Sequence, residues 1–168
     1  MLRAIPTYYD GHHFRSRLEA RWALFFNFIG IPWEFEPQGF AVGDAGFLPD
    51  FWLPSLRTWF EAKPDLGAIP DDEIRALIAK IDGFVGASDQ SIVVAFGSLR
   101  DGNRAEITNS VATGRDVEWG RCGTCLAWDL GGVGAEHRPC GHAVEMIGQK
   151  QATGALHDAH AHSFWEPA

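Results

Sequence analysis

The stretch that decides the fold is FLPDFWLPSLRTWFEAK, residues 47 to 63. Two acidic residues, Asp50 and Glu61, stand among apolar and aromatic side chains, and Lys63 follows the second acid at a spacing of two. The short segment PSL separates two runs rich in aromatic residues, which is typical of two strands joined by a turn. The sequence therefore predicts a β-hairpin that carries acids where burial makes a negative charge costly.

The register of this hairpin follows from its turn. If residues 54 to 57 form the turn, position 53 pairs with 58 and position 50 with 61, and side chains alternate between the two faces. The face predicted to join the core carries Phe51, Leu53, Phe60 and Ala62. The other face carries Asp50, Trp52, Trp59, Glu61 and Lys63. This register predicts the two acids side by side, roughly 5 Å apart at Cβ.

Two like charges placed opposite each other destabilise a hairpin, and burial adds the cost of desolvation. A divalent cation compensates both charges, and carboxylates are the ligands that Mg²⁺ or Mn²⁺ prefers. Lys63 alone compensates one of them. The alternative is an exposed hairpin face with an ordinary Glu61–Lys63 pair.

The segments before the hairpin predict a helix and a first strand. Residues 14 to 29 place an apolar stripe at helical spacing, and Gly30 and Pro32 end it. The stripe consists of Leu18, Trp22, Phe25 and Ile29. Residues 33 to 42 predict a strand interrupted near Pro37 and Gly39.

The segments after the hairpin predict a second helix and a buried strand. Residues 71 to 85 carry an apolar face at helical spacing, made of Ile74, Leu77, Ile78 and Ile81. Residues 91 to 97, SIVVAFG, are typical of a strand buried on both faces, and residues 104 to 110 predict an edge strand. The order helix, three strands, helix, strand indicates an α/β core with a mixed sheet.

Glu19 lies at the edge of the first helix's apolar stripe, next to Trp22, rather than opposite it. A helix packed over the sheet presents Glu19 to the acidic end of the hairpin, where it is a third candidate metal carboxylate. The alternative is an ordinary surface acid.

These residues resemble a known family. Pro49–Asp50 followed by Glu61–Ala62–Lys63, after SRLEARWALFF and the Glu36–Pro37 pair, resembles the PD-(D/E)XK superfamily, also called restriction-endonuclease-like, in its small phage and actinobacterial form. The resemblance covers roughly residues 12 to 100 and implies an αβββαβ core. Pro64 stands where Gly often follows the Lys, and proline keeps the preceding residue extended, so Lys63 is expected to stay in the strand.

The resemblance implies a metal-dependent deoxyribonuclease, and our hypothesis is that it acts on branched or otherwise structured DNA. It implies that Asp50 and Glu61 bind Mg²⁺ or Mn²⁺, that the backbone carbonyl of Ala62 is a further ligand, and that Glu19 completes the site. Lys63 is expected to position or deprotonate the attacking water, or to stabilise charge on the phosphate. The alternative function is a non-catalytic zinc-containing module that binds DNA or protein on a nuclease-like scaffold.

The net charge of −8 argues against a generally adhesive nucleic-acid-binding protein, so attraction of DNA must be local. Arg15, Arg17 and Arg21 are the candidate phosphate contacts, and solvated helix charges are the alternative. No apolar run approaches the roughly 20 residues of a membrane span, and the first residues lack an apolar signal core. We therefore expect an intracellular protein of a bacterial or phage-infected cytoplasm, without a membrane partner. Many members of the family that this sequence resembles form dimers, so a homodimer is one of the assemblies that we consider.

All three cysteines fall in one glycine-rich region. Cys122 and Cys125 form a C-x-x-C pair, and Cys140 and His142 form a second pair, which predicts a structural tetrahedral zinc site. His137 competes with His142 as the fourth ligand, and a redox pair or three unpaired thiols are the alternatives. The predicted organisation is a nuclease-like core over residues 1–112, a zinc-ribbon-like module over 113–149, and a tail over 150–168 that is either a docked helix or partly disordered.

Overall fold

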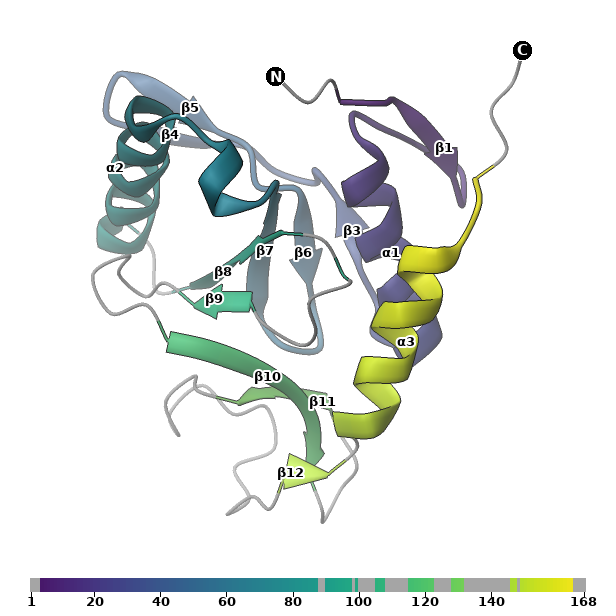
Figure 1. Cartoon of the computed structure of the whole chain (residues 1–168). Coiled ribbons are helices and arrows are strands. Elements are labelled where there is room, and N and C mark those ends of the chain that lie inside the picture. Colours follow the sequence, from purple (N-terminus) through teal and green to yellow (C-terminus); the bar gives the residue numbers. More distant parts are fainter. Residues whose placement is uncertain are drawn as a thin grey trace.

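The structure is a computed structural model that describes residues 4–87, 90–97, 99, 105–107, 115–122, 128–131, 146–147 and 149–164. This described part is α/β, with three α-helices and a mixed β-sheet (Figure 1). The α/β class predicted from the sequence is therefore confirmed.

The main sheet has the strand order β11-β10-β9-β8-β7-β6-β3, with β12 also paired to β10. In chain order, its strands are β3 (Glu34–Phe35), β6 (Phe51–Leu53), β7 (Thr58–Lys63), β8 (Ser91–Phe96), β9 (Ala105–Ile107), β10 (Arg115–Cys122), β11 (Trp128–Gly131) and β12 (Met146–Ile147). Only β7 and β8 pair in parallel among these described strands. The sheet is mixed because a helix, α2 (Asp71–Ala87), connects those two strands, as a parallel crossover requires.

The β6–β7 hairpin has the register that its turn predicts. Phe51 pairs with Phe60, Trp52 with Trp59, and Leu53 with Thr58. The turn is closed by a hydrogen bond of 3.0 Å from the Leu56 amide to the Leu53 carbonyl. β7 ends at Lys63, directly before Pro64, as expected for a residue that proline keeps extended.

Helix α1 (Arg17–Ile29) begins three residues later than the periodicity predicts. Its N-cap is Ser16, whose hydroxyl accepts a hydrogen bond of 3.2 Å from the Glu19 amide. This cap fixes the first turn at Arg17, so the helix does not extend to the residues before Ser16. Gly30 ends the helix at φ 71°, as predicted from the sequence. The residues before the cap form a small hairpin of β1 (Thr7–Tyr9) and β2 (His12–Phe14).

Two strand predictions need correction. The predicted first strand, 33 to 42, is split: β3 joins the main sheet, whereas β4 (Phe40–Val42) forms a separate hairpin with β5 (Ala45–Phe47). Pro37 lies at the break and has no amide hydrogen for a continuous ladder. The strand predicted over 104–110 is present as β9, but its predicted position at the edge is wrong, because β9 lies between β8 and β10.

The two faces of the sheet are covered by different elements (Figure 1). α1 packs on one face, where Phe26, Phe51 and Phe60 belong to the larger apolar cluster. α2 (Asp71–Ala87) and the β4–β5 hairpin cover the other, where Trp59, Ile81 and Phe84 form a second cluster. Side chains of the hairpin point alternately to the two faces of the sheet, as predicted. This alternation separates the apolar core into the two clusters.

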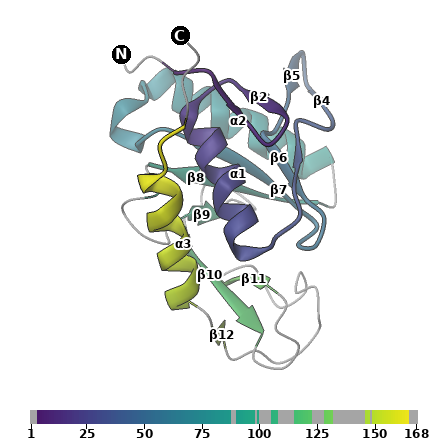
Figure 2. The ribbon, with the colours of Figure 1, turned by 90° about the vertical axis from the view of Figure 1, so that its right-hand side faces the viewer.

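The C-terminal helix α3 (Gln149–Ala161) lies against α1 (Figure 2). Ala152, Leu156 and Ala159 on its inner face are buried in the larger apolar cluster. The prediction of a docked helix in the tail is therefore confirmed for these residues. Trp119 of β10 is fully buried in the same cluster, so β10 contributes to the core although it begins after residue 112.

The predicted zinc ligands fall mostly outside the described residues. The backbone of Cys122 ends β10 and pairs with Met146, whereas Cys125, His137, Cys140 and His142 lie beyond the part of the chain that the structure describes. The zinc site thus stays a prediction. In the described residues no helix has the length and apolar character needed to cross a bilayer.

Candidate active site

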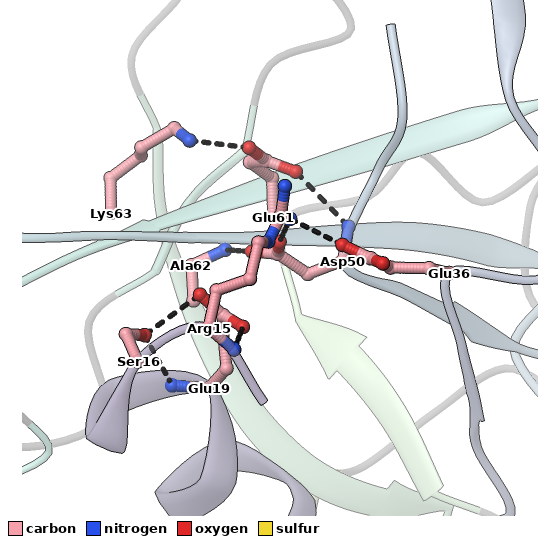
Figure 3. Close-up of polar contacts among 8 residues, drawn as sticks. All are labelled: Arg15, Ser16, Glu19, Glu36, Asp50, Glu61, Ala62 and Lys63. Carbon is pink, nitrogen blue, oxygen red and sulfur yellow. Dashed lines mark hydrogen bonds and ion pairs between the residues drawn. The ribbon is translucent and has the colours of Figure 1, made fainter. Parts of the chain in front are cut away.

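The acidic end of the hairpin is buried, and backbone amides hold it together (Figure 3). Asp50 is 2% exposed and Glu61 is 4% exposed. The Ala62 amide donates a hydrogen bond of 2.8 Å to Oδ2 of Asp50, and the Asp50 amide donates one of 3.1 Å to Oε2 of Glu61. The exposed-face alternative is therefore wrong for these two acids.

Glu19 reaches the same end of the sheet from α1. Its Oε2 accepts a hydrogen bond of 3.0 Å from the Arg15 amide, and its Oε1 accepts one of 2.7 Å from the Ser16 hydroxyl. The side chain is 7% exposed, so Glu19 is not an ordinary surface acid. Its charge contributes to raising the pKa of Asp50, which is consistent with the closeness of the two carboxylates.

Arg15 binds directly to the acidic end. Its Nη2 donates a hydrogen bond of 2.9 Å to Oδ1 of Asp50 and also pairs with Oε1 of Glu36. The side chain of Arg15 is 57% exposed, and the residue precedes α1 rather than lying on it. Arg17 and Arg21 lie on α1 and are not among the residues that line the cleft described below.

Lys63, at the end of β7, pairs with Oε1 of Glu61. Burial lowers the pKa of the Lys63 ammonium, but the negative charge and hydrogen bond of Glu61 outweigh burial, so the pKa is raised overall. Lys63 is therefore protonated and charged in this arrangement, and it donates to Glu61 rather than accepting a proton.

The pKa of Asp50 is raised to about 8, first by burial and then by the negative charge of Glu61. The hydrogen bond from the Ala62 amide and the charge of Lys63 act in the opposite direction but do not offset these effects. The carboxylate form of Asp50 is therefore unfavourable near neutral pH. A further positive charge beside Asp50 would stabilise this form.

A cleft of about 600 Å³ opens onto these groups. Besides Arg15 and Lys63, its wall includes Glu73, Leu77 and Lys80 from one face of α2. Apolar residues complete the lining: Phe47, Leu48, Pro64, Ile69 and Ala76. No residue that the structure describes forms an ion pair or hydrogen bond with Lys80.

The carboxylate oxygens suit a hard divalent cation by their chemistry. Within the described ranges, however, no three His, Cys, Asp or Glu side chains are arranged to hold a metal ion. Asp50 instead bonds to Arg15 and Ala62, and Glu61 to Lys63 and the Asp50 amide. A cation at this end therefore fits the donor set, and it would share these carboxylate oxygens with the contacts that they already make.

Sequence reasoning missed three residues of the site: Glu36, Glu73 and Lys80. Glu36 adopts a positive φ of 45°, which is uncommon for a residue other than glycine. The sequence does not predict this backbone conformation. Lys80 and Glu73 are seven residues apart, a spacing that puts them on one helix face. Lys80 is also one of only three lysines in the chain, which is the signal that could have found it.

Trp52 and Trp59 pack within the fold. Their rings lie 4.9 Å apart, and both belong to the cluster under α2 rather than under α1. The Trp59 indole donates a hydrogen bond of 2.6 Å to Gln90. Trp59 is therefore a core residue.

Comparison of the chain with protein-family models, with curated proteins and with solved structures finds no match in any of the three. The functional argument therefore depends on the geometry of the cleft and on the sequence motif.

Proposed function

We propose that this protein is a divalent-metal-dependent DNA nuclease that hydrolyses phosphodiester bonds. The observation that carries the proposal is the buried pair Asp50 and Glu61 with Lys63 beside it, all at the ends of adjacent strands and open to one cleft. Two buried acids of this kind cost stability, which a purely structural hairpin would avoid.

The topology supports a restriction-endonuclease-like core. In the main sheet α1 is followed by β3, β6 and β7, then by α2 and β8, with the separate β4–β5 hairpin inserted between β3 and β6, and β7 pairs in parallel with β8. This is the αβββαβ order that the sequence resemblance implies, with the acidic hairpin at its centre.

In the proposed site, Asp50 and Glu61 hold Mg²⁺ or Mn²⁺, with the Ala62 carbonyl and Glu19 as further ligands. When bound, the metal lowers the pKa of a water molecule and neutralises charge on the phosphate. Lys63 is charged and lies against Glu61, from which it orients the attacking water or stabilises the developing negative charge.

DNA is attracted locally, since the whole chain carries a net charge of −8. Lys80, on the α2 wall, has no partner among the described residues and provides a phosphate contact. Arg15 provides positive charge on the α1 side of the same cleft. The proposed substrate class is branched or otherwise structured DNA.

The deciding experiment incubates purified protein and Mn²⁺ with linear, nicked, single-stranded and branched DNA. We expect cleavage that requires the metal and disappears in Asp50→Asn. Equal trace cleavage by wild type and Asp50→Asn would show that the activity comes from a contaminant and would reject the proposal.

One observation favours a second candidate, a non-catalytic module that binds DNA or protein and keeps the fold as a scaffold. Arg15 and Lys63 already supply two positive charges to Asp50 and Glu61 without a metal. Metal-independent DNA binding without cleavage of any substrate in the same panel would support this candidate. The predicted zinc site is compatible with either function.

A further inference from the structure

We propose that Arg15 is a displaceable internal cation, which occupies Asp50 until a divalent metal takes its place. This inference concerns regulation of the proposed nuclease site and therefore rests on the proposed function. It predicts that Arg15 and the metal compete for the same carboxylate.

The contacts of Asp50 identify the oxygen at issue. Oδ2 of Asp50 accepts a hydrogen bond from the Ala62 amide, a backbone group fixed by the pairing of β7 with β8. Oδ1 is the oxygen that Arg15 contacts, at 2.9 Å (Figure 3). A metal that binds Asp50 through Oδ1 leaves the backbone hydrogen bond to Oδ2 intact and competes with Arg15 for the same oxygen.

The exposure of the two partners makes Arg15 the group that moves. The Asp50 side chain is 3% exposed, whereas the Arg15 side chain is 57% exposed and reaches in from the segment before α1. Arg15 can therefore turn outward without opening the core, but Asp50 cannot. Glu36, which also pairs with Arg15, keeps the guanidinium near the cleft after it leaves Asp50.

Displacement from Asp50 leaves the Arg15 guanidinium available to bind another anion. An arginine released from Asp50 at the mouth of the cleft is free to form a bidentate contact with a phosphate of DNA. Metal binding and exposure of a phosphate-binding group are then one event, whereas in the metal-free protein Arg15 keeps its contact with Asp50.

The test measures Mn²⁺ affinity in the absence of DNA, from the loss of the electron paramagnetic resonance signal of free Mn²⁺. We expect Arg15→Gln to bind Mn²⁺ about tenfold more tightly than wild type, because a competing positive charge is gone. Arg15→Lys, which keeps the charge but loses the planar fork, should fall between them. Arg57→Gln is the matched control, since Arg57 is exposed in the hairpin turn, and its affinity should equal that of wild type.

The double variant Arg15→Gln with Asp50→Asn locates the effect, and we expect it to lose the whole gain. An Arg15→Gln affinity equal to or weaker than wild type would overturn the inference, as would a gain that survives removal of Asp50. Cleavage assays report separately on the proposed function. Tighter Mn²⁺ binding in Arg15→Gln, together with no cleavage of any DNA by wild type, would support the competition and reject the nuclease.

Discussion

The backbone amide of Asp50 donates a hydrogen bond of 3.1 Å to Oε2 of Glu61, so one acid holds the other through its main chain rather than through its carboxylate. This contact fixes the Glu61 side chain at the end of β7 and leaves the Asp50 carboxylate to bond with other groups. The pair is thus positioned by the strands themselves, which are the most rigid elements available to a functional site.

The raised pKa of Asp50 predicts a pH-dependent stability. In the native state this pKa is about 8, whereas the ordinary pKa of an Asp carboxyl is 3.8, so the folded protein binds an extra proton between these values. The native state therefore loses stability as pH rises from about 4 to about 8. Asp50→Asn removes this cost, and its oxygen still accepts from Ala62. We expect its unfolding temperature without divalent metal to exceed that of wild type by about 5 °C at pH 9, and by much less at pH 5.

Thermal scans at both pH values check this. With added Mn²⁺ at pH 9, the unfolding temperature of wild type should exceed that of Asp50→Asn, since only wild type keeps the Asp50 carboxylate that binds the metal. An identical difference between the two proteins at pH 5 and pH 9 would mean that Asp50 does not titrate in this range.

Lys63 is expected to act in the reaction rather than in metal binding. Lys63→Met keeps the apolar stem but removes the ammonium that pairs with Glu61. We expect cleavage to fall about 100-fold or more while the Mn²⁺ affinity is retained, because a positioned proton-transfer or charge-stabilising group contributes at that scale. Single-turnover cleavage and Mn²⁺ titration of the same preparation separate the two effects. Loss of Mn²⁺ binding would assign Lys63 to assembly of the acidic pair instead.

Lys80 is expected to contact a DNA phosphate. Lys80→Ala should raise KM about threefold to tenfold without changing kcat, and it should reduce the slope of log affinity against log salt by about 1. Arg75→Ala is the matched control, because Arg75 is exposed on the same helix and does not line the cleft. If both variants change the salt slope equally, the effect comes from net charge and not from the position of Lys80.

Gly83 allows close packing between α2 and the β4–β5 hairpin. A Cβ at Gly83 would overlap Cγ1 of Val42, whereas one at Gly86 would meet nothing within 4 Å. We expect Gly86→Ala to stabilise the protein by about 0.5–1 kcal/mol, through helix propensity alone. Gly83→Ala should instead destabilise it by about 1 kcal/mol, since overpacking exceeds the same gain.

Urea denaturation of both variants measures these changes in the free energy of unfolding. Val42→Ala in the Gly83→Ala background should restore part of the loss, because it removes the overlapping methyl group. No recovery would place the strain elsewhere.

The predicted zinc site is tested by metal analysis. We expect about one zinc per chain in protein purified without chelators, lost in Cys122→Ser together with stability of the C-terminal third. A zinc-free wild-type protein would reject the site. Replacement of His142 or His137, one at a time, identifies the fourth ligand by which variant loses the metal.

The hairpin was predictable because strand alternation is a local rule: it set Phe51 opposite Phe60, and the structure has this pair. Glu19 was predictable because helix periodicity placed it at the edge of an apolar stripe. The partners of Arg15 were not predictable from the sequence. Its contact with Asp50 joins residues 35 positions apart and depends on how α1 packs. The start of α1 was missed because periodicity cannot distinguish an aromatic strand such as β2 from the first turn of a helix.

The packing of α3 on α1 has a consequence for how the protein is made. α1 leaves the ribosome before α3, so the surface that Leu156 and Ala159 cover stays exposed until residues 149–161 have also emerged. The nascent chain therefore carries an apolar helix surface without its covering helix while the residues between α1 and α3 are translated, and exposed apolar surface of this kind binds chaperones.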